Sequence, residues 1–385
     1  MRKDISIPRY FLIVTLLLGA VSYAECQELT DSSNTVSLLL IGDIMGHDEQ
    51  IRSAENMVDH SFTYDDVFKY IKPVIIESDI AVANFEVTLA GPPYKGYPRF
   101  SSPASLAAAC KNCSIGYLVT ANNHSADRGN QGIINTINRL DSLGIPHTGT
   151  FSDQAAKDSL SPLIIKKNGI AIAVMNYTFS TNGINVPKPV IVNMLEKEEI
   201  EKDIARARQK AADFIVLFLH WGREYDTIPS SYQVSLAKYF LSAGADIVIG
   251  SHPHVLQKMV LTSDSTSGKD NMVVYSLGNF ITNQRKPRTD GGAMVRLVIG
   301  RSEKGLKIIN AGYYLTWVYT PVQNYRKKFY ILPCSEFENN PGFFSEINDF
   351  RKMKYFIAKA RSLMNTSNTG VPEIRFNDST SVLKY

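Results

Sequence analysis

The chain has 385 residues, of which 44% are hydrophobic and 20% are charged. These proportions are those of an ordinary globular protein with a large core, and they exclude a disordered or fibrous chain. The formal net charge is only +4 at pH 7. Because nucleic-acid-binding surfaces need clustered basic residues, this small excess argues against nucleic acid as a partner.

The N-terminus has the pattern of a secretory signal peptide. Basic residues precede an apolar stretch over 10–21, and Ser22-Tyr23-Ala24 then supplies small residues at both positions that a signal peptidase inspects. The stretch is shorter than the roughly 20 apolar residues that span a bilayer, which favours a cleaved signal over an anchor. We therefore expect an exported protein of the periplasm or cell envelope, cleaved after Ala24. An uncleaved anchor, or a lipid on Cys26, is the alternative.

From residue 36 onward, short apolar runs alternate with amphipathic segments. The predicted strands are 37–41, 80–84, 115–120, 162–167, 170–176, 214–219, 246–249, 255–261, 272–277, 293–299 and 306–315. The predicted helices are 64–76, 105–110, 132–143, 196–212, 232–243 and one near 343–364. This order indicates a layered α/β sandwich around mixed sheets. The alternation fades late in the chain, so we expect one domain over 36–316 and a C-terminal appendage of unknown role over 317–385.

Four cysteines are present, at positions 26, 110, 113 and 334. Export would permit disulfides. The spacing of Cys110 and Cys113 fits a local bridge or a redox pair, whereas a zinc ribbon would need a second such pair. The simplest interpretation is two thiols near the surface at a helix end, and the sequence leaves open whether they are bridged.

Polar side chains that can bind metals stand directly after several predicted strands. They are Asp43, Glu86, Asn123, His124, His220, His252 and His254. In an open α/β sheet, the carboxyl ends of the strands line the crevice where ligands bind. Carboxylate, amide and neutral imidazole groups that meet there are the ligand set of a hydrolytic centre with two cations.

Each of these residues also has a purely structural interpretation. Gly42-Asp43 and Asn122-Asn123 are common in turns, and His220 next to Trp221 could be a hydrogen-bonded core histidine. His252-Pro253-His254 would need a turned backbone for both imidazoles to bind one site, since alternate residues of an extended chain face opposite ways. The repetition at five strand ends is what favours a metal centre.

Six short motifs follow one another along the chain: Gly-Asp-Ile-Met (42–45), Asn-Phe-Glu (84–86), Ala-Asn-Asn-His (121–124), His-Trp-Gly-Arg-Glu-Tyr (220–225), Gly-Ser-His-Pro-His-Val (250–255) and Tyr-Ser-Leu-Gly-Asn-Phe (275–280). This series resembles the CapA-type poly-γ-glutamate capsule-biosynthesis family, which is itself similar to the calcineurin-like metallophosphoesterases. The resemblance covers residues 36–300. It implies a four-layer α/β/β/α sandwich with two mixed sheets.

The resemblance also implies roles for individual residues. The metal ligands would be Asp43, Glu86, Asn123, His220, His252 and His254, holding one or two divalent ions of Mn, Zn or Fe. Glu86 would stand where the phosphoesterases place a bridging Asp, and His124 would donate a proton or a hydrogen bond to the substrate. One departure is Met45, where those enzymes have His. His47 is the candidate replacement.

These features predict a metal-dependent hydrolase or transferase that acts on an exported anionic polymer, with membrane-bound capsule synthesis machinery as a further partner. Lys95, Arg99 and Arg223 are the candidate substrate-binding residues, because their cations can bind carboxylate or phosphate. The further loop cations Arg285, Lys286 and Arg288 could equally be solvated surface. Two alternatives stay open: a non-catalytic accessory subunit that binds polymer, and a phosphoesterase acting on a soluble phosphate ester.

The signal-peptide hypothesis makes a prediction about mass. Protein recovered from the envelope fraction should have an intact mass that corresponds to a chain beginning at Glu25, because cleavage follows Ala24. A mass that retains residues 1–24, or that includes a lipid on Cys26, would show an anchored protein instead.

Overall fold

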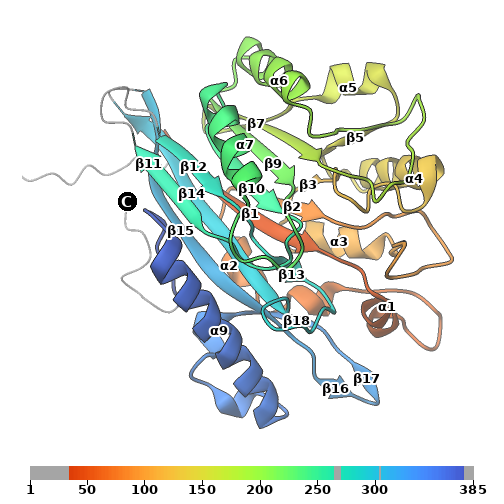
Figure 1. Ribbon diagram of the computed structural model, residues 1–385. Coiled ribbons are helices and arrows are strands. Elements are labelled where there is room, and N and C mark those ends of the chain that lie inside the picture. Colours follow the sequence, from red (N-terminus) through yellow and green to blue (C-terminus); the bar gives the residue numbers. More distant parts are fainter. Residues whose placement is uncertain (1–33, 264–269, 303–304, 377–385) are drawn as a thin grey trace, which may run out of the picture. The chain divides into compact units, whose positions relative to one another are not determined.

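The computed structural model describes residues 34–263, 270–302 and 305–376, so the expected signal peptide and Cys26 lie outside the described residues (Figure 1). The larger sheet has the order β18-β15-β14-β1-β2-β3-β4, with β13 paired to β1. Its strands are β1 (Thr35–Ile44), β2 (Ile80–Phe85), β3 (Tyr117–Val119), β4 (His147–Thr148), β13 (Asn279–Ile281), β14 (Gly291–Ser302), β15 (Gly305–Tyr319) and β18 (Tyr330–Pro333). Neighbours β1 to β4 are parallel, whereas β14 runs antiparallel to β1.

The smaller sheet has the order β11-β12-β10-β9-β7-β6. Its strands are β6 (Leu163–Lys167), β7 (Ile170–Thr178), β9 (Phe214–His220), β10 (Ile247–Ser251), β11 (Met259–Ser263) and β12 (Asp270–Val274). The four central strands are parallel and both edge strands are antiparallel. The predicted α/β class with mixed sheets is therefore confirmed. Two short pairs complete the strands: β5 (Thr150–Phe151) with β8 (Ile191–Val192), and β16 (Val322–Gln323) with β17 (Arg326–Lys327).

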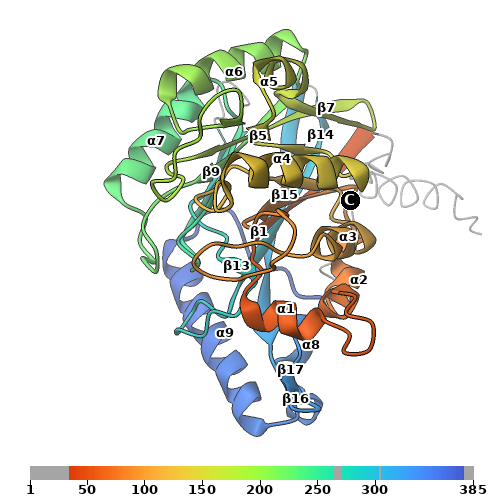
Figure 2. The same cartoon turned by 90° about the vertical axis from the view of Figure 1, so that its right-hand side faces the viewer.

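Helices cover both sheets. They are α1 (Asp48–Ala54), η2 (Asp65–Phe68), α2 (Lys72–Ile75), α3 (Ser105–Asn112), α4 (Gly129–Ser142), α5 (Gln154–Leu160), α6 (Lys197–Gln209), α7 (Ser231–Ser242), α8 (Cys334–Phe337), η3 (Pro341–Phe343) and α9 (Ile347–Ser367). Figure 2 shows α6 and α7 together at one end and α9 at the other. Among the described residues, no helix combines the length and the hydropathy that a membrane span requires.

The core is arranged around the alternating faces of the strands. Leu38 and Leu40 of β1 pack with Val216 of β9 in a cluster between the two sheets. The residues between them in β1 face the other way, where Leu39 packs with α2, α3 and α4. On the smaller sheet, Leu217 of β9 likewise packs against α6 and α7. Because the central strands are buried on both faces, they appear in the sequence as continuous apolar runs.

Two predicted elements differ in the structure, each for a local reason. The helix expected over 64–76 is divided into η2 and α2, because Pro73 lacks the N–H that a helix interior needs and is tolerated only in the first turn of α2. The strand expected over 255–261 begins only at Met259, since the chain is still turning after His254. The predicted hairpin at 162–176 is confirmed, with positive φ at both Asn168 and Gly169, as its two-residue turn requires.

The three described cysteines are buried, and none forms a disulfide. The expectation that Cys110 and Cys113 lie near the surface is wrong, because the end of α3 packs into the apolar cluster beneath the larger sheet. Burial raises the pKa of the Cys113 thiol to about 12 and that of Cys110 well above its usual range. Since the thiolate is the reactive form, both residues act as apolar core groups.

The C-terminal residues share the core of the preceding sheets. The expected boundary between residues 316 and 317 falls inside β15, and β18 pairs with the second half of that strand. Met353 and Phe356 of α9 are buried in the cluster between the sheets, and Figure 1 shows α9 lying along β15. Arg361 of α9 then donates hydrogen bonds to Glu338 and Glu373, which fastens the last described segment to α8 and α9.

We predict that Arg361→Met lowers the free energy of unfolding by about 2 kcal/mol, because hydrogen bonds between charged partly buried groups contribute on that order. Urea denaturation measures the change. Lys202→Met is the control, since its ion pair with Glu199 is exposed to solvent and should contribute little to stability. Equal losses in the two variants would contradict the stabilising role of Arg361.

Candidate metal centre

Asp43 lies in β1 between asparagines on the two neighbouring strands. Its register partners are Asn84 of β2 and Asn279 of β13. The Asn84 amide donates to Asp43 Oδ1 at 2.8 Å. A Cβ at Gly42 would lie 2.2 Å from the carbonyl oxygen of Gly278, so Gly42 is required by close strand packing and not by a turn. The pairing of three strands therefore fixes the Asp43 carboxylate.

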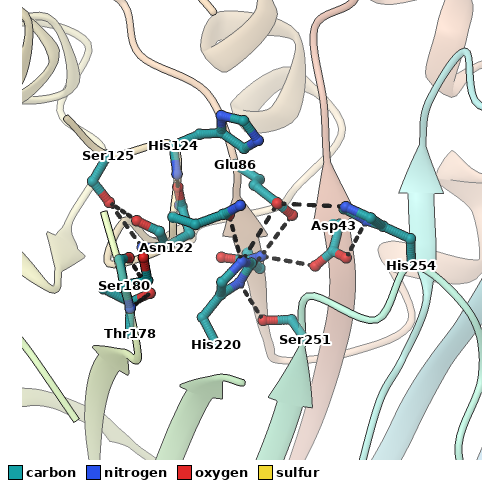
Figure 3. A network of polar contacts seen from close by, with 12 residues as sticks. Asp43, Glu86, Asn122, His124, Ser125, Thr178, Ser180, His220, Ser251 and His254 are labelled. Atoms are coloured by element: carbon teal, nitrogen blue, oxygen red, sulfur yellow. Dashed lines mark hydrogen bonds and ion pairs between the residues drawn. The ribbon is translucent and has the colours of Figure 1, made fainter. Parts of the chain in front are cut away.

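Glu86 follows β2 directly and faces histidines of the other sheet. Its Oε1 lies 3.5 Å from Nε2 of His220 and 3.8 Å from Nε2 of His254. His220 is the last residue of β9; its Nε2 lies 2.8 Å from Oδ1 of Asn123, and its Nδ1 lies 3.1 Å from the Ser251 hydroxyl. Figure 3 shows the side chains of Asp43, Glu86, His220 and His254 pointing toward one another.

The segment His252-Pro253-His254 has the turned backbone that both imidazoles need in order to reach one site. Its two histidines have φ values of +96° and +57°, a region that residues other than glycine rarely adopt. The turn brings the His252 ring to 4.9 Å from that of His220, measured between centroids. It also places His254 Nδ1 3.1 Å from Asp43 Oδ2 and 3.0 Å from Asn279 Oδ1. Strained backbone of this kind concentrates at functional sites.

The potential ligands form two groups that share one carboxylate. In each group the ligand atoms lie within 4.8 Å of one another. The first group is Glu86, His220 and His252, with Asn123 beside His220, and the second is Asp43, Glu86 and His254. All six residues expected to bind metal therefore lie together, although their role as ligands stays a prediction.

The electrostatics of this cluster favour a bound cation. Asp43 and Glu86 are both 0% exposed, and within the described residues neither forms an ion pair with lysine or arginine. Burial, together with the charge of Asp43, raises the pKa of Glu86 well above its usual range. Two carboxylates buried side by side without a compensating charge are unfavourable, and a divalent ion would supply that charge.

The histidines of the cluster are suited to bind such an ion. Burial, together with the neighbouring imidazoles, lowers the pKa of His252 to about 3 and that of His220 well below its usual value. Both rings are therefore neutral, which is the form that coordinates metals. Within the described residues, His252 Nδ1 and Glu86 Oε1 are buried without a hydrogen-bond partner. The donor set thus fits a divalent cation.

His124 lies beside the two groups without belonging to either. Its Nδ1 is 2.8 Å from Oδ2 of Asp127, which also accepts a hydrogen bond from the Phe100 amide at 2.7 Å. The Phe100 ring packs edge-on against His124, with centroids 4.6 Å apart. With Nδ1 held by Asp127, Nε2 is the nitrogen left for a substrate. Asp127 was not among the residues expected at the site, and its spacing of three residues from His124 is the signal in the sequence that points to it.

The phosphoesterase pattern has a histidine ligand at position 45. Neither Met45 nor His47 supplies that ligand. Met45 is buried in the apolar cluster beneath the larger sheet. Nδ1 of His47 lies 3.0 Å from Gln50 Oε1 and accepts from the amide of Asn283 at 3.2 Å. His47 is in neither of the two ligand groups found among the described residues. Its proposed replacement role therefore has no support in the geometry.

The three cations expected to contact substrate lie on exposed parts of the surface. Lys95 forms an ion pair with Asp48 at 3.5 Å, and Arg99 and Arg223 are exposed. A different cation is connected to the centre by direct contacts. The Lys286 ammonium lies 4.1 Å from the ring centroid of Tyr225, and that ring is 6.4 Å from His254. The substrate roles of the first three residues stay predictions, and Lys286 joins them as a candidate.

Comparison with known proteins identifies the family. A family model described as bacterial capsule synthesis protein PGA_cap matches residues 37–284. The chain belongs to this family. Capsule biosynthesis protein CapA of Bacillus anthracis is 29% identical over 309 residues, which cover 75% of this chain and 72% of that protein. PGA biosynthesis protein CapA of Bacillus subtilis (strain 168) is also 29% identical, over 78% of this chain and 77% of its own.

Similar solved structures are more distant. Haemophilus influenzae NAD nucleotidase is 16% identical and aligns with a TM-score of 0.47 over 85% of this chain and 67% of its own. The calcineurin-like phosphoesterase YfkN of Bacillus subtilis is 14% identical, with a TM-score of 0.45 over 73% of this chain and 90% of its own. At these scores the likeness carries no argument about activity.

Removal of the shared carboxylate should weaken metal binding more than any other single change. We expect Glu86→Gln to lower the affinity for Mn²⁺ or Zn²⁺ at least ~10-fold, since even residues that only orient metal ligands contribute that much. Isothermal titration of metal-stripped protein measures the affinity, with circular dichroism to verify folding. His60→Ala is the matched control, because His60 is an exposed histidine outside the cluster. Unchanged affinity in Glu86→Gln would contradict the metal centre.

Proposed function

We propose that the protein is a metal-dependent hydrolase or transferase that acts on an anionic polymer of capsule synthesis, such as poly-γ-glutamate, after its export from the cytoplasm. The observation that carries this proposal is the position of Glu86, which is shared by two buried groups of ligands. Such a shared carboxylate is suited to hold two cations close together. The names of the relatives, which refer to capsule and PGA biosynthesis, supply the substrate class.

Divalent ions held by Asp43, Glu86, Asn123 and the three histidines would polarise the bond to be broken. The remaining steps fall to side chains around them. His124, fixed through Nδ1 by Asp127, would give a proton or a hydrogen bond from Nε2 to the oxygen or nitrogen on which charge develops. Lys286, stacked on Tyr225, would bind a carboxylate of the polymer beside the centre.

A specific observation favours a second candidate function. Met45 is buried where the phosphoesterase pattern has a histidine, and His47 does not take its place. A centre that lacks one ligand could hold a single structural ion and only bind the polymer. A relative from Mycobacterium tuberculosis, 23% identical over 46% of this chain, bears the name of a probable polyglutamine synthesis accessory protein. The non-catalytic accessory role is therefore the alternative.

His124→Ala separates the two functions. We expect this variant to keep its metal content and its stability but to lose a hundredfold or more in turnover, because one transition-state donor contributes on the order of 10²-fold or more. Turnover is measured on γ-glutamyl amides, phosphodiesters and phosphomonoesters, so the same panel identifies the bond. Asp127→Asn should lower kcat with little change in KM, since Asp127 acts through the imidazole that it positions, and the remaining amide oxygen can still accept from the Phe100 amide.

His60→Ala is again the control and should behave as wild type. The accessory function predicts a different result: no turnover by wild type on any of these substrates, together with polymer binding that weakens as salt is added. If His124→Ala supports capsule formation in cells as well as wild type does, the catalytic role is wrong.

A further inference from the structure

A second candidate site lies beside the first turns of α9. It is a cavity of about 780 Å³ between the segment that connects β13 to β14, the strand β17 and the first turns of α9. Five basic residues line it: Arg285, Arg288, Lys327, Arg351 and Lys352. Every lining residue lies beyond position 284, where the match to the capsule family ends. We call it the cation cavity.

Two of these five cations already have partners within the protein. The Arg285 guanidinium donates to the carbonyl oxygens of Val318 and Thr282, at 3.0 and 3.1 Å, and so braces the connecting segment. Lys352 forms an ion pair with Asp349 at 2.9 Å. Among the described residues, the other three cations form no ion pair and no side-chain hydrogen bond. They are Arg288, Lys327 and Arg351.

The acidic residues of the cavity do not neutralise these three cations. Asp349 is held by Lys352, and Asp290 accepts a hydrogen bond from the Trp317 indole at 2.8 Å. Burial raises the pKa of Asp290 from its ordinary value. Glu346 is the remaining carboxylate of the lining. The five cations of the lining thus outnumber its three carboxylates, two of which, Glu346 and Asp349, lie at the N-terminus of α9.

The cation cavity and the metal centre share one connecting segment. Asn279, whose Oδ1 lies 3.0 Å from His254, also donates to the carbonyl oxygen of Thr289 at 2.7 Å. The amide of Asn283 donates to His47. Thr289 of the segment thus contacts Asn279, which lies beside His254, while Arg285 and Arg288 of the same segment line the cavity. The two sites are therefore connected through this one segment.

We infer that the cation cavity binds a stretch of a polycarboxylate chain through Arg288, Lys327 and Arg351, next to the part held at the metal centre; this inference rests on the proposed function for the identity of the chain. The three unpaired cations come from three separate elements, the connecting segment, β17 and α9. Several guanidinium and ammonium groups around one cavity suit a ligand that carries several carboxylates.

Binding of a short, fluorescein-labelled poly-γ-glutamate oligomer, followed by fluorescence anisotropy, tests the inference. We expect the double variant Arg288→Gln/Arg351→Gln to bind it at least ~10-fold more weakly than wild type, since each charge-assisted hydrogen bond contributes on that scale. Its metal content should be unchanged. The control is Lys202→Gln/Lys238→Gln, which removes the same charge from exposed positions on α6 and α7, at the end of the molecule opposite α9 (Figure 2). This control should bind as wild type.

Further measurements distinguish failure of this inference from failure of the proposed function. They also distinguish a polycarboxylate ligand from other anions. Glu86→Gln, which tests the metal centre, should still bind the oligomer at the cavity. If binding is lost in Glu86→Gln but kept in the arginine variant, the cation cavity is wrong while the metal centre stands. If wild type has no turnover yet binding depends on both arginines, the cavity stands without the catalytic function. If unlabelled polyphosphate displaces the oligomer but polyglutamate does not, the polycarboxylate assignment is overturned.

Discussion

The structure depends on the groups that surround two carboxylates buried next to each other. Asp43 and Glu86 have no arginine or lysine partner among the described residues, and desolvation disfavours the charge of each. The surrounding groups are arranged accordingly. Asn84 donates to Asp43, while the rings of His220 and His254 face the carboxylates. A cluster of this composition is unfavourable by itself and becomes favourable with a cation, so metal binding and local stability should be coupled.

The cluster also depends on the packing of one sheet against the other. Asp43 and Glu86 come from the ends of β1 and β2 in the larger sheet, whereas His220 and His252 come from the ends of β9 and β10 in the smaller one. The apolar cluster between the sheets therefore sets the distance between carboxylates and imidazoles. A slip of one residue in β1 would turn Asp43 to the opposite face. Its register is fixed by pairing with β2 on one side and β14 on the other.

The C-terminal residues contribute to this arrangement and extend it. The second half of β15 with β18 enlarges the larger sheet, and α9 covers the part of its inner face that lies near β15. Because α9 packs beside the connecting segment between β13 and β14, the same helix that completes the core also forms a wall of the cation cavity. A region whose role the sequence does not indicate thus has a structural function and a place next to the metal centre.

The sequence by itself determined the α/β class, most strands and the family, because central strands appear as continuous apolar runs and the metal-binding residues directly follow them. It also brought Asp43, Glu86 and His220 into one hypothesis, since each stands at the end of an apolar run that predicts a strand. Only the tertiary structure decided the rest. The left-handed backbone of His252 and His254, the contact of Asp127 with His124, and the burial of Met45 depend on neighbours distant in the chain. The same holds for the cation cavity, because charges on a loop, a strand and a helix become one site only when packing places them together.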